Sequence, residues 1–523
     1  VTRQILDRAL SHNMGDRPVS AIMQPELPIV SAVTPLDELR DLFLERSYRF
    51  VIVDEAGRPA GIITRMELFR RLFEHQHAAG SSLDHRMAGA RPTSQPISRI
   101  LREISPPWVQ RLIAAAREVA DRLGISVYLV GGMVRDMLLE RVNEDVDLVV
   151  EGDGIAFAEA LAEVLDGRAH PHLPFLTAVI TLPDGLRIDV ASARTEFYRT
   201  PAALPEVATS LIRQDLYRRD FTINSLAVVL SGDRYGELVD FFGGRMDIQR
   251  QEIRVLHSLS FIDDPTRALR AVRYARRLGF TIAADTRNLI STALEEGVFE
   301  RLSGQRLRRE LEILLAEPHP TPALALIADL GLLPAICPGL EWSEQIGSYL
   351  MEIEGQLAWY QLEHIGPPPE PWILFLAGLS LAAGNDAISD LAQRLQLGGP
   401  IHDLFLALPA AVDEMKKAAN SGLSLSQQAQ VLDQHPTETL LLAMSDLPLQ
   451  LRRSLAAAAV AAARVQLPVT GQDLLDGGVS PGPHIGRALR LTRDALIDDM
   501  IAAEEALGWA LQTARSLEVE TSV

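Results

Sequence analysis

Short apolar runs and helical repeats alternate through the middle of the chain. Some runs have the length of strands, whereas other stretches repeat apolar residues every three or four positions, as helices do. Strands are expected at 126–130, 145–151, 176–182 and 186–191, and helices at 109–123, 134–140 and 155–165. This mixture predicts an α/β head over residues 108–255.

From residue 256 to the end the pattern is helical, without a convincing strand. Leucine and alanine recur at helical spacing, interrupted by proline-rich turns at 366–369 and 480–483. The longest alanine-rich run, 455–463, is shorter than the roughly 20 residues of a membrane span, so no membrane partner is expected. The predicted fold class is α+β, with a helical neck at 256–320 and a helical body and tail at 321–523.

The N-terminal residues form a separate α/β pattern. Strands are expected at 19–23, 29–33, 50–54 and 60–64, and helices at 35–46 and up to residue 74. This unit resembles a CBS module, a small fold that often binds adenine nucleotides and usually occurs in pairs. Because residues 1–6 echo residues 63–68, we expect region 1–75 to hold the end of one module and one full module. Residues 76–107, with Gly-Ser-Ser and several prolines, are expected to be a linker.

Composition narrows the function classes. The formal net charge is −19, which argues against general affinity for nucleic acid but allows a local basic track. Nearly all the positive charge is arginine, and five arginines fall between residues 267 and 277, where no acid occurs. The single cysteine, Cys337, excludes an internal disulfide framework and a cysteine-rich zinc site, and fits a cytoplasmic protein.

Two aspartates, Asp145 and Asp147, are the strongest candidates for chemistry. Residues i and i+2 of a strand point to the same face, and two carboxylates so close repel each other unless a divalent cation or a proton lies between them. Asp189, in a second apolar strand, could complete a three-carboxylate cage for two Mg²⁺ ions. The turn at Gly131-Gly132 lets a backbone approach a bulky anion. The simpler alternatives are acids on the wet side of an edge strand and a merely structural turn.

Asp264 and Arg267 form a second candidate pair. If both lie on one helix face, an aspartate that accepts and an arginine that donates match the edge of adenine and of cytosine, but not of guanine or uracil. The pair would then select A and C. The alternative is a helix N-cap region with an intrahelical ion pair.

Seven motifs in a fixed order give the chain a family resemblance. They are Leu129-Val-Gly-Gly-Met-Val-Arg-Asp136, Asp145-Val-Asp147, Arg194-Thr-Glu196, residues 215–225 (DLYRRDFTINS), residues 240–244 (DFFGG), residues 263–267 (DDPTR) and residues 300–306 (ERLSGQR). Together they resemble the class II tRNA nucleotidyltransferases, which build or repair the 3′ CCA end of tRNA, and the related bacterial poly(A) polymerases. The resemblance covers residues 108–320, with a fainter continuation in the tail.

The resemblance implies roles for individual residues. Asp145 and Asp147 would be metal ligands, with Asp189 as a third catalytic acid. The nucleotide would be bound by Gly131, Gly132, Arg135, Arg218, Arg219, Asp220, Asn224, Asp264, Arg267, Arg273 and Arg276. The RNA would be bound by Arg301, Arg306 and Arg309. The family usually has glutamate at the position of Asp263, and the shorter aspartate side chain could orient Arg267 differently and so change the choice of base.

The predicted function is a Mg²⁺-dependent transfer of the terminal A, with C as a further substrate base, from ATP or CTP to a tRNA acceptor end. The A-adding choice follows from analogy with long bacterial A-adding enzymes that carry a CBS extension. The alternatives are a poly(A) polymerase, CC or full CCA addition, and a CBS-based nucleotide sensor with an inactive head. The resemblance also allows a homodimer through the CBS region.

Overall fold

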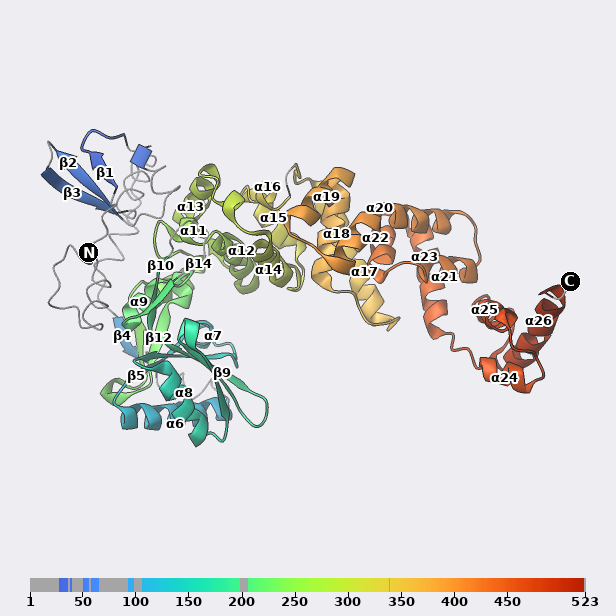
Figure 1. Cartoon of the computed structure of the whole chain (residues 1–523), viewed down its shortest axis with the longest axis horizontal. Coiled ribbons are helices and arrows are strands. Elements are labelled where there is room, and N and C mark those ends of the chain that lie inside the picture. Colours follow the sequence, from blue (N-terminus) through green and yellow to red (C-terminus); the bar gives the residue numbers. More distant parts are fainter. Residues whose placement is uncertain are drawn as a thin grey trace. The chain divides into compact units, whose positions relative to one another are not determined.

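The computed structural model describes residues 28–35, 38–39, 50–55, 58–64, 93–97, 106–197, 206–337 and 339–521. They divide into two compact units, residues 1–301 and residues 302–523. The division falls inside the neck that the sequence predicts as one segment. In Figure 1 the sheets lie in the first unit and the second unit is helical, which confirms the α+β class.

The N-terminal region contains a three-stranded sheet of β1 (Ile29–Ser31), β2 (Phe50–Glu55) and β3 (Arg58–Thr64). β1 and β2 are parallel, and β2 and β3 form an antiparallel hairpin with a register shift after Val53. Three of the four predicted strands are therefore confirmed. The predicted strand at 19–23, the helix near residue 74 and the echo at 1–6 lie outside the described residues, as does most of the helix at 35–46.

The head is built on an eight-stranded sheet in which only β6 and β9 are parallel neighbours. In spatial order its strands are β4 (Thr93–Pro96), β13 (Glu237–Asp240), β12 (Leu226–Val229), β5 (Ser126–Val130), β6 (Val146–Glu151), β9 (Arg187–Ser192), β8 (Thr177–Thr181) and β7 (Arg168–His172). Strand β4 corrects the prediction of a continuous linker at 76–107. Its sequence, TSQP, has no apolar alternation, and its partner β13 supplies the ladder.

Three helices pack against this sheet. In α6 (Pro107–Leu123), Val109, Leu112, Ala116 and Val119 are buried at helical spacing, and the helix ends at Gly124 in the left-handed conformation. It packs on α8 (Gly154–Val164), which covers β8 and β9, whereas α7 (Gly132–Leu138) lies against β5 and β12. The predicted helices of the head are thus confirmed.

The first unit contains further strands and helices outside the eight-stranded sheet. They are the hairpin β10 (Arg194–Phe197) and β11 (Glu206–Thr209), α9 (Ile212–Tyr217), α10 (Gly244–Arg250), α11 (Ser260–Asp263), α12 (Thr266–Leu278) and α13 (Ala284–Glu295). The prediction of no strand beyond residue 256 is wrong at β15 (Thr281–Ile282), which pairs with β14 (Glu252–Ile253). Two residues are too few to show a strand periodicity.

The second unit is a succession of helices with proline-rich turns where the sequence predicts them. Its helices are α14 (Gly304–Leu315), α15 (Thr321–Asp329), α16 (Leu333–Ile336), α17 (Glu344–Leu362), α18 (Pro371–Ala383), α19 (Asn385–Arg394), α20 (Gly399–Asn420), α21 (Leu425–Leu432), α22 (Thr437–Ser445), α23 (Leu449–Arg464), α24 (Gly471–Asp476), α25 (Pro483–Ile497) and α26 (Ala506–Thr521). In the described part of the chain, no helix combines the length and the apolar content that a membrane crossing needs.

Candidate active site

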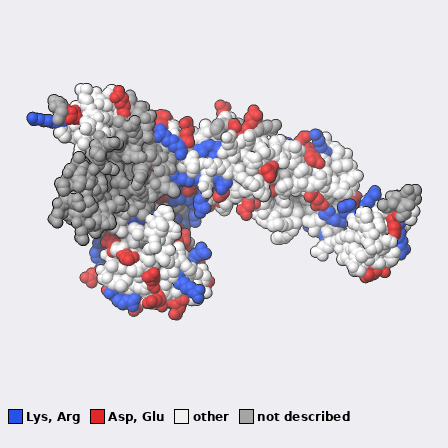
Figure 2. Space-filling model, viewed as in Figure 1, with Lys and Arg blue, Asp and Glu red and all other residues white. Residues whose placement is uncertain are grey.

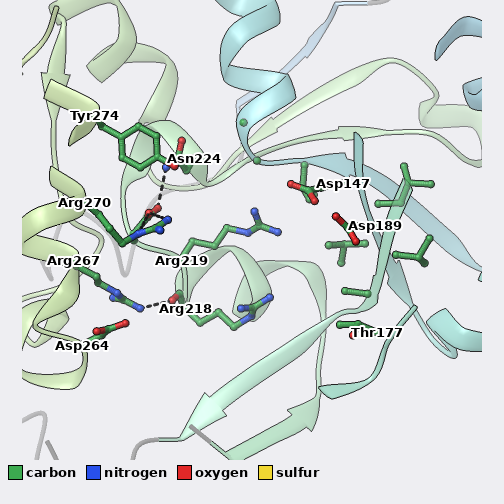
Figure 3. Close-up of a pocket in the computed structure, with 18 residues that line it drawn as sticks. Asp147, Thr177, Asp189, Arg218, Arg219, Asn224, Asp264, Arg267, Arg270 and Tyr274 are labelled. Atoms are coloured by element: carbon green, nitrogen blue, oxygen red, sulfur yellow. Dashed lines mark hydrogen bonds and ion pairs between the residues drawn. The ribbon is translucent and has the colours of Figure 1, made fainter. Parts of the chain in front are cut away.

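An open pocket of about 520 Å³ lies in the first unit between the end of the sheet and α12. Its walls have opposite charge, as Figure 3 shows: aspartates from β6 and β9 face arginines from the segment after α9. The lining residues with ionisable or polar side chains are Asp147, Thr177, Asp189, Arg218, Arg219, Asp220, Asn224, Asp264, Arg267, Arg270 and Tyr274. The volume is within the range of small-molecule sites.

Strand pairing brings the acids together. Asp147 in β6 and Asp189 in β9 are direct partners in the parallel ladder, so their side chains project from the same face of the sheet. Asp145 comes one residue before β6 begins, is exposed and does not line the pocket. In the described residues no group of three His, Cys, Asp or Glu side chains is close enough to hold a metal ion. The three acids of the predicted cage therefore do not converge on one point: Asp147 and Asp189 line the pocket, and Asp145 lies outside its lining.

The acids nevertheless influence one another. Burial, followed by the charges of Asp189 and Asp145, raises the pKa of Asp147 from 3.8 to about 6, although Arg219 opposes the shift. Partial desolvation and then the charge of Asp145 raise the pKa of Asp189 as well, while its side chain stays open to the pocket. Carboxylates that resist ionisation in this way fit a hard divalent cation, which prefers oxygen ligands.

The two predicted glycines open the wall beside the acids. Gly131 has φ +73°, a conformation that favours glycine. A Cβ atom there would lie 3.0 Å from Nη1 of Arg219 and 3.3 Å from Oδ2 of Asp147. Gly132 begins α7, and both glycines line the pocket. The backbone of this turn therefore borders the space between the acids and the arginines.

Arg218 and Arg219 form the arginine wall of the pocket, and the buried carboxylate of Asp215 holds both side chains in place. Its oxygens accept from Nε and Nη2 of Arg218 at 3.0 and 2.7 Å and from Nη2 of Arg219 at 3.2 Å. Burial alone raises its pKa, but Arg219 and Arg218 bring the pKa of Asp215 below the ordinary value. Asp215 lies in one of the seven motifs, but no role was predicted for it. Its spacing of three and four residues from the two arginines was the available signal.

Asp220 connects the arginine wall to α12. Its Oδ2 accepts from Nε and Nη2 of Arg270 at 3.0 and 2.6 Å, and its Oδ1 accepts from Nδ2 of Asn224 at 3.0 Å. The pair with Arg270 and the bond from Asn224 lower the pKa of Asp220 against the effect of burial. Arg270 was not among the predicted site residues, although it lies one turn beyond Arg267.

Asp264 and Arg267 line the same pocket, but not as predicted. Asp264 precedes α12, and its Oδ1 accepts from the backbone N and Oγ1 of Thr266 at 3.1 and 2.6 Å. Arg267 donates to Oγ of Ser260 and to the carbonyl of Arg218, each at 2.7 Å. The expectation of two residues on one helix face is therefore wrong, because the helix begins only at Thr266. Figure 3 shows both side chains on the same side of the pocket.

Several predicted nucleotide residues lie away from the pocket lining. Arg135 is buried and bonded to Asp136 and Asn224, Arg273 is buried against the ring of Tyr274, and Arg276 is exposed on α12. Tyr274, which sequence analysis missed, lines the pocket and lies 5.1 to 5.8 Å from the guanidinium carbons of Arg135, Arg270 and Arg273. Arg135 is buried because it bonds Asn224, 89 residues away, a contact that the local sequence pattern does not show.

The predicted RNA-binding arginines belong to two different units. Arg301 is exposed at the end of the first unit, and Arg306 and Arg309 lie on α14 of the second. Acidic and basic side chains are mixed over the head surface drawn in Figure 2. That Arg301, Arg306 and Arg309 bind RNA stays a prediction.

Comparison with known proteins agrees with the motifs. Residues 127–254 match the poly A polymerase head domain, residues 279–343 match the probable RNA and SrmB-binding site of polymerase A, and residues 19–74 match the CBS domain. The A-adding tRNA nucleotidyltransferase of Geobacter sulfurreducens is 38% identical over 76% of this chain, which spans 45% of that protein's length. The CC-adding tRNA nucleotidyltransferase of Deinococcus radiodurans is 33% identical over 69% of this chain and 82% of its own.

A solved structure, the Thermotoga maritima CCA-adding enzyme complexed with tRNA, has the same architecture. It superimposes with a TM-score of 0.68 at 29% identity, covering 81% of this chain and 99% of that chain. The resemblance inferred from the motifs, including the CBS region, is confirmed by these matches.

Proposed function

Because the chain belongs to the tRNA nucleotidyltransferase family, we propose that it transfers AMP from ATP to the 3′ end of a tRNA and releases pyrophosphate. The A-adding choice is supported by the similarity to the Geobacter enzyme, which is A-adding by name. The observation that carries the proposal is the pocket in which Asp147 and Asp189 face Arg218 and Arg219 across a glycine turn.

The acids would hold Mg²⁺. Asp145 and Asp147 supply oxygen donors, and Asp189 is next to Asp147. Burial, followed by the charges of Asp189 and Asp145, raises the pKa of Asp147, and a bound cation would favour its ionised form. Mg²⁺ in phosphate-transferring sites is commonly held by one or two carboxylates together with substrate phosphates, so a complete protein cage is not needed. Bound there, the metal would neutralise charge that develops on the phosphate oxygens.

The arginine wall would bind the triphosphate. Arg218 and Arg219 present guanidinium groups to the pocket, and Asp215 fixes them from behind. A guanidinium is a rigid fork of donors that matches phosphate oxygens, and it keeps its charge at any physiological pH. Holding the nucleotide between these arginines and the acids would place its α-phosphate near Asp147 and Asp189.

Asp264 and Arg267 would read the base. An aspartate oxygen accepts from the exocyclic amino group of adenine or cytosine, and an arginine donates to the adjacent ring nitrogen. Arg267 is held by Ser260 and the Arg218 carbonyl, so its orientation is fixed before a base arrives. The pair accounts for selection of A and C over G and U, and leaves the choice between A and C to be measured.

Primer extension tests the proposal. The protein is incubated with tRNA transcripts that end at the discriminator base, at -C or at -CC, each with labelled ATP or CTP. We expect AMP on the -CC primer and no CMP on any primer. Incorporation of CMP would replace the A-adding assignment by CC or CCA addition, and a long adenylate tail on unstructured RNA would show a poly(A) polymerase. No transfer to any primer would refute the proposal.

A further inference from the structure

Asn143 lies between α7 and β6 and joins two parts of the head with one side chain. Its Oδ1 accepts from the backbone N of Asp145 at 2.8 Å, and its Nδ2 donates to Oδ2 of Asp136 at 2.6 Å. Asn143 is partly buried and is not among the predicted site residues. A side chain that uses both ends of its amide fixes the distance between the two groups it bonds.

Asp136 is itself rigidly held. It lies on α7, is buried, and accepts from Nε and Nη2 of Arg135, both at 2.8 Å. Arg135 in turn donates from Nη1 to Oδ1 of Asn224 at 2.7 Å. Asn143 is thus anchored to a buried ion pair and not to a mobile surface group.

The same chain of hydrogen bonds reaches the pocket. Asn224 donates to Asp220, and Asp220 accepts from Arg270 on α12. Figure 3 shows Asn224 and Arg270 on the arginine side of the pocket. A continuous set of bonds therefore runs from α12, through Asp220, Asn224 and the Arg135–Asp136 pair, to Asn143 and the backbone of Asp145.

Asp145 lies outside the sheet, so its position is not fixed by strand pairing. It precedes β6, so the sheet ladder begins only at Val146, and its side chain is exposed. Among the described residues, the bond from its backbone N to Asn143 is the hydrogen bond that connects it to the rest of the head. Asp147, by contrast, is held within β6 on both sides, by β5 and by β9.

We infer that Asn143 is a positioning residue for Asp145, which sets the place of the outer metal-binding carboxylate relative to Asp147 through its bond to Asp136. The inference rests on the proposed function, because it takes Asp145 to be a metal ligand. Groups that orient metal ligands typically contribute tenfold to hundredfold in metal affinity or activity. A purely local role, in which Asn143 only closes the turn to Asp145, is the competing explanation.

Three variants separate the two explanations. Asn143→Ala removes both bonds. Asn143→Ser keeps an acceptor that can close a turn to the backbone N two residues on, but is too short to reach Asp136. Val142→Ala is the control for a change in the same loop, because Val142 is 70% exposed and precedes Asn143.

The readouts are the affinity for Mn²⁺, measured by titration calorimetry with ATP present, the Mg²⁺ concentration for half-maximal transfer, and thermal stability. For Asn143→Ala and Asn143→Ser alike we expect metal affinity to fall about tenfold or more, with an unchanged melting temperature for the head. Val142→Ala should match the wild type.

Two results would overturn the inference. Wild-type metal affinity in Asn143→Ala would show that Asp145 does not depend on this side chain, and full recovery in Asn143→Ser would show that only the local turn matters. A wild-type protein that binds Mn²⁺ but transfers no nucleotide would refute the proposed function and leave the positioning result to be judged on metal binding alone.

Discussion

Aspartates occur in both walls of the pocket, but their pKa values are shifted in opposite directions. On the sheet, Asp147 and Asp189 are neighbours of like charge and their pKa values are raised. On the facing segment, Asp215 and Asp220 are more deeply buried, yet arginines bring their pKa values below the ordinary one. Burial alone would have raised all four, so the difference comes from the partners.

The difference separates structural from functional acids. Asp215 and Asp220 use their charge within the protein, to fix Arg218, Arg219 and Arg270. The charge of Asp147 is offset only in part, by Arg219, and because burial raises its pKa, the ionised form lowers the stability of the folded protein. A carboxylate of this second kind, in a pocket, is the stronger candidate for a ligand of the metal.

Replacement of Asp147 should break the acid wall with the largest effect. For Asp147→Asn we expect transfer to fall by at least about a thousandfold, because the metal loses a charged ligand and its charge stabilisation is worth several kcal/mol. Single-turnover primer extension at saturating ATP measures this. The control Asp233→Asn changes an exposed aspartate of the head and should be silent. Activity within tenfold of the wild type would remove Asp147 from the metal site.

Replacement of Asp215 tests the opposite wall, and here the expected loss is in stability. Asp215→Ala leaves Arg218 and Arg219 without the carboxylate that pairs with both, and breaking a buried ion pair costs about 3–5 kcal/mol. Urea denaturation followed by the fluorescence of Trp108 reports on the head, in a background in which the other four of the five tryptophans are replaced by phenylalanine. Arg234→Ala, which breaks an exposed pair with Glu237, should cost less than about 1 kcal/mol. Equal losses in the two variants would contradict the comparison.

The pH dependence of stability sharpens the contrast. The folded pKa of Asp147 is about 6, against 3.8 for the ordinary group, so the folded state holds a proton that the unfolded state has released between these values. Stability without metal should therefore decrease as pH rises from about 4 to 6, by at most about 3 kcal/mol. Asp147→Asn cannot ionise and should be more stable than the wild type at pH 8 but not at pH 3.5. A variant that is less stable at pH 8 would show that Asp147 is structurally satisfied.

The strands that carry Asp147 and Asp189 could be predicted from the residues themselves, whereas Arg218 and Arg219 were predicted only through the family resemblance. Alternation within two apolar strands is a local signal, so β6, β9 and the pairing of Asp147 with Asp189 could be anticipated. Asp215 bonds Arg218, three residues away, a spacing that is typical of neighbours on a helix. Arg270 bonds Asp220, 50 residues away, and no local pattern predicts that contact. Arg135 was misplaced for the same reason, since its partner Asn224 is 89 residues away.

The strands that were missed have a similar explanation. β12 is buried along its whole length and β13 along most of it, so neither alternates between apolar and polar residues. β4 exists because β13 offers an edge to pair with. α12 starts at Thr266 directly after Pro265, so Asp264 lies before the helix on which it was predicted and accepts from the backbone N of Thr266.

Gly131 lies where the two walls meet, and its substitution should give the smallest effect. Alanine at φ +73° is strained by about 1 kcal/mol, and its Cβ would press on Arg219 and Asp147. Gly185 has φ +88° with nothing within 4 Å of a Cβ, so Gly185→Ala carries comparable backbone strain without the contacts. We expect both variants to lose similar stability, and only Gly131→Ala to weaken ATP binding, by about threefold to tenfold, as measured by calorimetry with Ca²⁺. If the two variants bound ATP equally well, Gly131 would be needed only for the conformation of the turn. The space that a missing Cβ leaves between Asp147 and Arg219 would then not matter for ATP binding.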